Sequence, residues 1–370
     1  MALSGNKADR YIGLMSGTSL DGVDAVLVDF VNGKPNILAS SHLPFSVSIR
    51  DQALSLQRSG HDELRRAALL GNQLADIYAE ATLKIVAQAG LKGQDIAAIG
   101  CHGQTLRHRP QDGYTLQIGN AALLAERSGI SVVADFRSRD IAAGGQGAPL
   151  VPALHEALFR KPNLHRVILN LGGIANITDL APGRPTTGFD CGPANILIDI
   201  WVERSLGVTI DSGGEWALTG TVIPELFDRL IADPYFSATP PKSCGREEFG
   251  IDWLLDSLVG KERPQDVQAT LVKLTALSVS RSIGKWCGNP DEVFACGGGV
   301  HNRALMSALR NALGSSVMDT TDALGVPAHL VEAVAFAWLA RRCVNGEEGN
   351  LPAVTGARGS RILGAIYLAA

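Results

Sequence analysis

The sequence predicts an α/β protein of two domains in which one fold unit is used twice. A chain of 370 residues is longer than a single hydrophobic core usually supports. Its hydrophobic content of 46%, with 41 glycines and only 5% aromatic residues, is typical of strands and helices joined by tight turns. Each half begins with an apolar strand, a glycine turn and a second apolar strand, and each half later has a strand that enters a glycine-rich turn. This repetition predicts a duplicated unit with a crevice between the copies.

The charge and the cysteines restrict the class of function. The formal net charge is −4 without a long run of either sign, which disfavours a nucleic-acid surface or a polybasic membrane face. No segment reaches the roughly 18 apolar residues of a spanning helix, and the N-terminal residues lack the apolar region of a secretory signal. The six cysteines form no CxxC pair, zinc pattern or disulfide framework. We therefore expect a cytoplasmic protein without a membrane or nucleic-acid partner.

A loop-like stretch marks the predicted domain boundary. Residues 136–149, FRSRDIAAGGQGAP, combine glycine, proline and charged residues without a hydrophobic period. We predict a first domain over residues 1–140 and a second over 141–344, with residues 345–370 packing back onto the first. The hydrophobic patterns predict strands over residues 11–15, 23–30, 36–47, 96–100, 115–118 and 130–135 and two within 167–180, and helices over 61–90, 121–128, 153–159, 224–235, 267–286, 299–312 and 331–343, with another helix beginning near Pro193.

The turn between the first two strands, MSGTSLDGVD (15–24), is the first candidate site. Gly17 and Gly22 carry no Cβ, so the backbone there can approach a ligand closely. The serine and threonine hydroxyls stand beside a row of backbone N–H groups, which suits a phosphate. Asp21 and Asp24 would repel a bare phosphate and fit better beside a bound cation or a hydroxyl. For this stretch alone, an ordinary hairpin turn is an equal alternative.

Several common motifs are absent from the sequence. There is no G-x-x-x-x-G-K-[ST] phosphate loop, no G-x-G-x-x-G after a strand and no G-x-S-x-G serine elbow. The glycine hairpin turns are therefore the best phosphate candidates.

Three stretches together resemble the superfamily of sugar kinases, actin and heat-shock chaperones. They are the turn at 17–24, the turn at 171–175 and CGGGVHN at 296–302. The resemblance implies two duplicated RNase H-like (actin-like ATPase) domains with ATP and a sugar in a central cleft. It makes these turns two phosphate turns and an adenosine turn, and it assigns ATP binding to Gly17, Thr18, Ser19, Leu20, Asp21, Gly22, Val23, Asp24, Gly172, Gly173, Asn176, Gly297, Gly298, Gly299 and Asn302. For Asn302, a capping role at the start of the next helix is the alternative.

Five motifs follow one another along the chain: MSGTSLDGVD (15–24), GCHGQT (100–105), NLGGIAN (170–176), GFDCGPAN (188–195) and CGGGVHN (296–302). With these motifs in the same order, the chain is similar, from Tyr11 to Leu368, to the anhydro-N-acetylmuramic acid kinases. This resemblance implies that water opens the anhydro bridge of 1,6-anhydro-N-acetylmuramic acid while O6 takes the γ-phosphoryl of ATP. The products would be the 6-phosphate and ADP, in peptidoglycan recycling, with Mg²⁺ as cofactor. We expect a homodimer.

Asp190 in TGFDCGP is the candidate general base. It lies at a strand end between Phe189 and Cys191, where partial desolvation raises the pKa of a carboxylate. By the resemblance, it activates the water that attacks the anomeric carbon. The family typically has Thr or Ser where this chain has Cys191, a departure that leaves the acidic position intact. An N-cap role for the following helix is the alternative.

Four further residues are candidates for sugar binding. His102 follows a strand beside Gly103, although a lone histidine is more often structural. Asp135 offers a carboxylate to sugar hydroxyls and Arg139 a cation to the lactyl carboxylate, with a local ion pair as the alternative. Glu332 leads an apolar helix, where it could also complement the helix dipole. The metal ligands remain unassigned, because His329 and Glu332 lack a third ligand.

Two other functions fit the same fold. Another sugar kinase or an acetate kinase would phosphorylate a free hydroxyl or carboxylate without activating water. A chaperone- or actin-like binding module would normally carry an additional domain or filament inserts, for which 370 residues leave little room. Consumption of an anhydro-sugar distinguishes the first alternative, and protein-stimulated ATP turnover the second.

Overall fold

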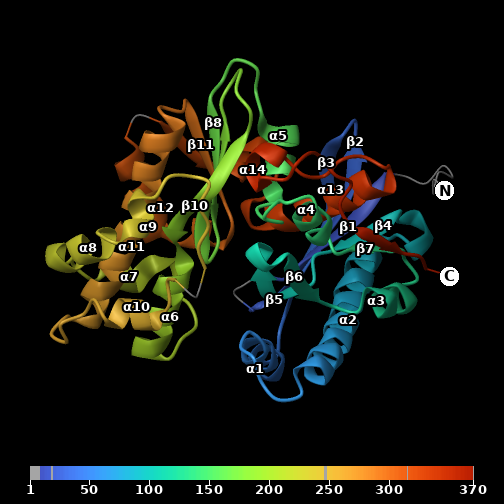
Figure 1. Cartoon of the computed structure of the whole chain (residues 1–370), viewed down its shortest axis with the longest axis horizontal. Coiled ribbons are helices and arrows are strands. Elements are labelled where there is room, and N and C mark those ends of the chain that lie inside the picture. Colours follow the sequence, from blue (N-terminus) through green and yellow to red (C-terminus); the bar gives the residue numbers. More distant parts are fainter. Residues whose placement is uncertain (1–8, 18–19, 246–247, 315, 370) are drawn as a thin grey trace. The chain divides into compact units, whose positions relative to one another are not determined.

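A computed structural model of the chain describes residues 9–17, 20–245, 248–314 and 316–369. It divides into two compact units, each built on a sheet flanked by helices (Figure 1). Unit 1 comprises residues 1–154 and 330–370, and unit 2 comprises residues 155–329. The elements of unit 1 are β1 (Arg10–Met15), β2 (Gly22–Val31), β3 (Lys34–Pro44), α1 (Val47–Leu56), α2 (Glu63–Gln88), β4 (Ala98–Cys101), β5 (Gln104–Arg109), β6 (Tyr114–Ile118), α3 (Ala121–Ser128), β7 (Val132–Ala134), α4 (Ser138–Ala142), α13 (Val331–Val344), α14 (Pro352–Thr355) and β13 (Ala365–Tyr367).

The sheet of unit 1 has the strand order β13-β7-β4-β1-β2-β3. Strands β1, β2 and β3 form an antiparallel meander, whereas β4 and β7 run parallel to β1. β1 is buried almost throughout because its residues are apolar and it lies inside the sheet. β3 alternates between exposed and half-buried residues, as expected of an edge strand with one solvated face. Strands β5 and β6 form a separate hairpin.

Helix α13 lies directly against this sheet, at two glycines. A Cβ on Gly13 of β1 would stand 1.8 Å from the carbonyl oxygen of Ala333, and one on Gly100 of β4 would stand 2.0 Å from that of Phe336. Any side chain at either glycine would therefore push the helix off the sheet. Figure 1 shows the red α13 beside the blue β1, although the two elements come from opposite ends of the chain.

The C-terminal segment is tied to unit 1 by a buried carboxylate. Asp140 is 0% exposed, and its Oδ1 accepts hydrogen bonds from Asn350 Nδ2 (2.6 Å) and Thr355 Oγ1 (2.8 Å). Its Oδ2 accepts the Gly147 N–H at 2.8 Å. Further along the chain, β13 pairs with β7 in antiparallel register.

The units differ from the predicted domains at 1–140 and 141–344. The structure places residues 141–154 and 330–344, which include α13, in unit 1. The sequence of α13 is apolar on nearly every side, so it indicates burial without indicating which sheet the helix covers. That choice depends on Gly13 and Gly100, which are distant in sequence.

The sheet of unit 2 repeats the arrangement of unit 1, which confirms the predicted duplicated α/β fold. Its order is β10-β9-β8-β11-β12, with β8, β9 and β10 antiparallel and β11 and β12 parallel to β8. The same positions in unit 1 are held by β3-β2-β1-β4-β7. The elements are α5 (Val151–Phe159, which begins in unit 1), β8 (Arg166–Leu171), β9 (Ile174–Leu180), β10 (Thr187–Pro193), α6 (Asn195–Leu206), α7 (Glu215–Leu218), α8 (Pro224–Ile231), α9 (Pro234–Ser237), α10 (Ile251–Leu255), α11 (Pro264–Ser282), β11 (Glu292–Cys296), α12 (Arg303–Leu313) and β12 (Val317–Thr320).

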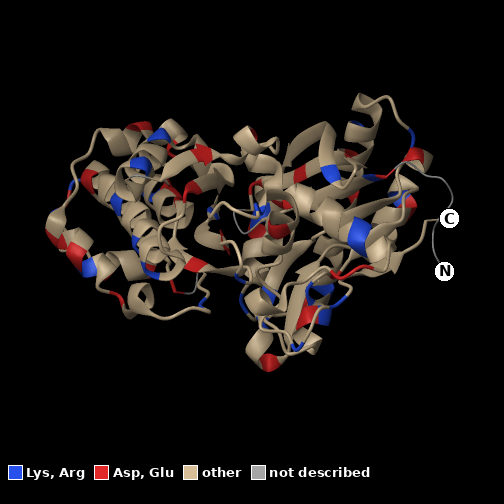
Figure 2. Cartoon of the chain, turned by 90° about the horizontal axis from the view of Figure 1, so that it is seen from above, with Lys and Arg blue, Asp and Glu red and all other residues tan. Residues whose placement is uncertain are grey.

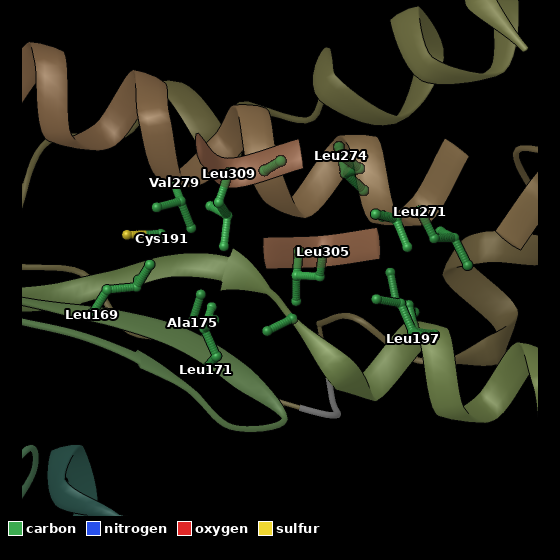
Figure 3. Close-up of a cluster of buried hydrophobic side chains, with 14 of the residues drawn as sticks. Leu169, Leu171, Ala175, Cys191, Leu197, Leu271, Leu274, Val279, Leu305 and Leu309 are labelled. Atoms are coloured by element: carbon green, nitrogen blue, oxygen red, sulfur yellow. The ribbon is translucent and has the colours of Figure 1, made fainter. Parts of the chain in front are cut away.

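The core of unit 2 lies between one face of this sheet and helices α11 and α12 (Figure 3). Leu169, Ala175 and Cys191 reach it from the sheet, and leucines of both helices meet them. A bulge between Asp190 and Gly192 interrupts the pairing of β10 with β9. Phe189 and Cys191 are both buried in this core, so Asp190 between them faces the other side of the strand.

Some local predictions were wrong because turn residues override hydrophobic patterns. The strand predicted over 36–47 ends at Pro44, and Ser46 caps a helix, α1, that the sequence analysis missed. Pro193 closes β10, and α6 begins at Asn195.

Charged residues of both signs are interspersed over each unit (Figure 2). Among the described residues, no helix has the combined length and apolar character needed to cross a bilayer.

Candidate active site

A row of polar residues crosses one end of the sheet of unit 2. Asn170 of β8 is the cross-strand neighbour of Asn176 of β9, which in turn pairs with Asp190 of β10. On the other side, Cys296 of β11 is in register with Asn170, and its thiol lies 3.9 Å from Asn170 Oδ1. Directly opposite residues share a sheet face, so three of the sequence motifs meet on the face that points away from the α11–α12 core.

Asp190 is half-buried at the end of this row and is held on three sides. Its N–H donates to the Lys242 carbonyl (3.1 Å), its carbonyl accepts from Tyr235 Oη (2.9 Å), and its Oδ2 accepts the Cys244 N–H (3.1 Å). Burial raises the pKa of Asp190 to about 7, against the opposing effect of the Cys244 hydrogen bond. A carboxylate with a pKa near neutrality is suited to accept a proton from water.

The loop that the sequence analysis placed at 242–250, without assigning it a role, supplies two of these three contacts from its described residues. Lys242 and Cys244 both reach Asp190 through their backbones. A loop without a hydrophobic period gives no sequence signal of what it covers, and the partner is about fifty residues away. The structure explains why a segment lies here: β10 is an edge strand, and its outer backbone groups need a covering segment.

The second and third glycine turns lie together in unit 2. A Cβ on Gly297 would stand 2.4 Å from Asn170 Oδ1, and one on Gly299 would stand 2.7 Å from Leu171 Cβ. Gly298 between them has no neighbour within 4 Å of its Cβ position. Two of the glycines therefore allow β11 to close onto β8, whereas Gly298 leaves open space for a ligand.

The start of α6 braces the turn at Gly172 and Gly173. The N–H groups of Ala194 and Ile196 donate to the Gly173 carbonyl (2.9 and 3.1 Å), and Asn195 Nδ2 donates to the Gly172 carbonyl at 2.9 Å. These amide groups therefore donate their hydrogen bonds within the protein. The turn is held in one position beside the polar row.

Asn302 has a structural function at the third turn. Its side chain caps α12 by accepting the Leu305 N–H at 3.0 Å, as in the capping alternative. It is only 7% exposed, and Gly214 packs so closely that a Cβ there would be 2.1 Å from Asn302 Oδ1. Its predicted contact with ATP stays a prediction.

In unit 1, the first glycine turn is anchored by distant side chains. Ser16 Oγ lies 2.7 Å from Tyr78 Oη and donates to the Gly103 carbonyl at 3.1 Å, while Gln104 Nε2 donates to the Gly17 carbonyl at 3.2 Å. The predicted residues Thr18 and Ser19 lie outside the described residues. Ser16 and Gly17, which precede them, are held in place by Gly103 and Gln104 of the motif GCHGQT.

The rest of this turn is shaped by its backbone. Leu20 is buried with a φ of 58°, and Val23 is fully buried in the core of unit 1. A Cβ on Gly22 would stand 2.5 Å from the Leu43 carbonyl oxygen, so β3 requires glycine there. The side chains of Leu20 and Val23 are thus packed into unit 1, and the predicted contacts of Leu20, Gly22 and Val23 with ATP stay predictions.

The carboxylates of this turn are accessible. Asp21 is exposed, and Asp24 Oδ1 lies 2.9 Å from His42 Nδ1 across the β2–β3 pair. Among the described residues, no three His, Cys, Asp or Glu side chains gather in a manner that could hold a metal ion. Mg²⁺ usually takes one or two carboxylates together with substrate phosphates and water, so this donor set fits Mg²⁺ that arrives with ATP.

A second polar cluster in unit 1 brings together two predicted residues and one that the sequence analysis missed. Arg137 donates through both its Nε and its NH2 to His102 Nε2 (3.2 and 2.9 Å) and through NH1 to the Gly147 carbonyl (2.7 Å). Burial lowers the pKa of His102 to about 3 and that of Arg137 to about 10, and the nearby Glu332 counteracts the shift of Arg137. At neutral pH, the site thus combines a neutral imidazole, a guanidinium and a carboxylate.

Asp135 and Arg139 are not part of this cluster. Asp135 is exposed, and its Oδ1 accepts the Ser138 N–H (3.3 Å) and hydroxyl (2.5 Å) at the start of α4. Arg139 is exposed on α4, whereas Arg137 just before the helix points inward. The two arginines are two residues apart in one loop-like stretch, and no local pattern indicates which of them faces the core.

The fold and these sites define a class of protein. The solved structure of component A of the (R)-2-hydroxyglutaryl-CoA dehydratase of Acidaminococcus fermentans has a TM-score of 0.50 at 14% identity, covering 91% of this chain and 99% of that chain. With the duplicated sheets, this confirms the predicted actin-like ATPase fold.

The family follows from closer relatives. The family described as anhydro-N-acetylmuramic acid kinase matches residues 9–369. Proteins of that name from Nitrosospira multiformis and Nitrosomonas europaea are 53% and 51% identical, over 98% and 96% of this chain and 99% of each relative. The chain belongs to the anhydro-N-acetylmuramic acid kinase family, as the motifs predicted, and it is a phosphotransferase.

Proposed function

We propose that the protein opens 1,6-anhydro-N-acetylmuramic acid with water and transfers the γ-phosphoryl group of ATP to O6. The products are N-acetylmuramic acid 6-phosphate and ADP. Membership of the family supports the substrate and the reaction class. The observation that carries the mechanism is Asp190, half-buried at the end of the polar row with its pKa raised to about 7.

Asp190 serves as the general base. Its carboxylate accepts a proton from a water molecule as the water oxygen bonds to the anomeric carbon, and the bond from that carbon to O6 breaks. O6 then bonds to the γ-phosphorus, and ADP leaves. The bulged, edge position of Asp190 gives it a fixed backbone and a side chain on the face opposite the core, which suits a base that must select one water.

The cluster around Arg137 recognises the sugar. The substrate carries a lactyl carboxylate, and a guanidinium is the side chain best suited to bind one by paired hydrogen bonds. His102 is uncharged at neutral pH because burial lowers its pKa, so it contacts sugar hydroxyls without competing for the carboxylate. Glu332 accepts a hydroxyl proton in a hydrogen bond. We retain Asp135 and Arg139 as outer residues of this site, because both are exposed nearby in sequence.

The kinase takes its phosphoryl group from ATP, and the glycine turns are assigned to the nucleotide. Gly298 provides the open backbone segment for adenosine, and the turns at Gly17–Asp24 and Gly172–Gly173 are assigned to the phosphates. Mg²⁺ bound to the phosphates would neutralise charge as it develops on the transferred group, with Asp21 and Asp24 as its nearest protein carboxylates. We further propose a cytoplasmic homodimer, to be checked by sedimentation.

The test is an assay for ADP release with Mg²⁺, with and without 1,6-anhydro-N-acetylmuramic acid. The sugar product should gain one water and one phosphoryl group, and in heavy-oxygen water the label should enter the C1 hydroxyl. ADP release that needs a free hexose would overturn the substrate and keep the kinase. Turnover stimulated by no small molecule would favour a binding module.

A further inference from the structure

We propose that residues 235–245 and Glu248 of unit 2 form a clamp that positions the Asp190 carboxylate, with Lys242 and Glu248 as positioning residues of opposite charge. This Asp190 clamp begins at the aromatic ring of Tyr235 and ends at the turn after Cys244. The inference rests on the proposed role of Asp190 as general base, and it gives a function to the loop that had none.

The clamp holds Asp190 by backbone and side chain together. β10 is the edge strand of its sheet, so the outer backbone groups of Asp190 have no strand to pair with. The clamp pairs with them instead, through the Lys242 carbonyl at 3.1 Å and Tyr235 Oη at 2.9 Å. The Cys244 N–H then binds Oδ2 at 3.1 Å. With one oxygen engaged, the carboxylate is oriented so that the other, Oδ1, receives the proton.

Lys242 joins the two ends of the clamp. Its Nζ donates to the Tyr235 carbonyl at 2.9 Å and lies 4.5 Å from the centre of the Tyr235 ring. Glu248 closes the far end, because its Oε2 accepts the Gly245 N–H at 2.7 Å, directly after Cys244. Each of these residues therefore supports a group that contacts Asp190, without contacting the reacting atoms itself.

The charges of the clamp act on Asp190 in opposite directions. Burial is the main cause of its raised pKa; Glu248 raises this pKa further and Lys242 lowers it. The other titratable groups around Asp190 are Tyr235, Cys191 and Cys244, whose pKa values burial raises, so all three are uncharged at neutral pH. Lys242 and Glu248 are thus the charged pair that tunes the base.

The test compares the pH dependence of kcat/KM for the anhydro-sugar in two variants. Lys242→Met removes the cation, so the acidic limb should move to higher pH by about half a unit. Glu248→Gln removes an exposed anion, so the limb should move to lower pH by a smaller amount, roughly 0.2–0.3 units. If the substitutions only loosened the loop, both variants would have a lower maximal kcat/KM. Their acidic limbs would then not move in opposite directions.

Lys285 supplies a matched control. Its Nζ lies 4.5 Å from the Trp286 ring centre and donates to the Ser237 carbonyl at 3.3 Å, the same two kinds of contact as Lys242 makes. The acidic limb of the kcat/KM profile of Lys285→Met should therefore coincide with that of the wild type. Tyr235→Phe removes only the hydroxyl on the Asp190 carbonyl, and it should lower kcat about fivefold with the KM for ATP unchanged.

The outcomes separate this inference from the proposed function. If the wild type does not convert the anhydro-sugar, the proposed function fails. If the wild type converts it, Asp190→Asn is inactive, and the profiles of K242M and E248Q coincide with the wild type, then the clamp does not tune the base and this inference is overturned. Should K242M not fold, the shift in E248Q and the loss in Y235F still decide the question.

Discussion

Two carboxylates stand at the same end of the two sheets, Asp24 on the second strand of its unit and Asp190 on the third, and their surroundings make them chemically different. Asp24 lies near the start of β2, between Met15 of β1 and His42 of β3. Asp190 lies on β10 beside Asn176 of β9. Both are at the end of the sheet where the first strand of the unit finishes, since β1 and β8 have the same neighbours and directions.

The difference arises from what each sheet edge meets. In unit 1, the third strand presents His42, and the Asp24–His42 pair is open to solvent, with 36% and 45% of the side chains exposed. In unit 2, the third strand carries the carboxylate itself, and the loop from Tyr235 covers it. Burial then raises the pKa of Asp190 to about 7. Duplicated folds thus acquire different chemistry through the loop that covers an edge strand.

The largest effect is expected from neutralising the two carboxylates in turn. Asp190→Asn should lower kcat by about 10³-fold, because general-base catalysis is worth ~10²–10⁴-fold. Asp24→Asn should lower it by no more than about tenfold, with the KM for Mg²⁺–ATP raised. In the wild type, kcat/KM should fall about tenfold per pH unit below pH ~7, because the base is protonated there. Equal losses in both variants would contradict the comparison.

The next largest effect concerns sugar recognition in unit 1. Arg137→Met should lower kcat/KM for the sugar by about 10- to 100-fold, the equivalent of a charged hydrogen bond of ~1.5–3 kcal/mol. The KM for ATP should not change. Arg139→Met is the matched comparison: Arg139 is exposed and is proposed only as an outer residue of the site, so this variant should lose less activity than Arg137→Met. A larger loss in the Arg139 variant would favour Arg139 as the residue that binds the lactyl carboxylate.

The ionised Asp190 carboxylate should also lower the free energy of unfolding of the protein. Its folded pKa is raised above its unfolded value, so the folded state binds the extra proton between pH ~4 and ~7. The free energy of unfolding should therefore fall as pH rises through that range. Because Asn carries no charge, Asp190→Asn should be more stable than the wild type by about 1–2 kcal/mol at pH 8, and equally stable near pH 4. Denaturant titrations at both pH values check this, and a destabilised variant at pH 8 would contradict it.

The smallest effect is expected at the exposed pair. His42→Ala should reduce the free energy of unfolding by about 0.2–1 kcal/mol, because both side chains are well solvated. The loss should shrink in high salt, where exposed charges are screened. A salt-independent loss of several kcal/mol would show that the first turn depends on this pair for its structure.

The local parts of the fold were predictable from the sequence. Helix α2 and strand β2 match the predicted segments closely, because a continuous hydrophobic period or an apolar run specifies them without help from other elements. The start of α3, predicted at residue 121, is local in the same way: Asn120 Oδ1 accepts the Leu123 N–H at 3.0 Å, a contact between near neighbours in sequence. Three of the five motifs also converge on one row, because their residues lie at the same end of neighbouring strands of the unit 2 sheet.

The parts that escaped prediction depend on long-range contacts. Arg137 was not among the predicted residues, because its inward direction is set by contacts with His102 and Gly147. The loop at Lys242 gave no signal because its contact with Asp190 is made mainly by backbone groups, which every residue carries. Assigning α13 to unit 1 required knowing that it rests on Gly13.

The dependence of unit 1 on α13 has a consequence for how the protein is made. Residues 155–329 are continuous in the chain, so unit 2 can fold as soon as it has left the ribosome. β1 and β4 emerge earlier but stay uncovered at Gly13 and Gly100 until α13 is synthesised. From the end of β4 at Cys101 to the end of α13 at Val344 the ribosome adds 243 residues, so at ~5–20 residues per second that delay is roughly 12–50 s. During this interval, the nascent first half exposes an apolar sheet face, which makes it a natural client for ribosome-associated chaperones.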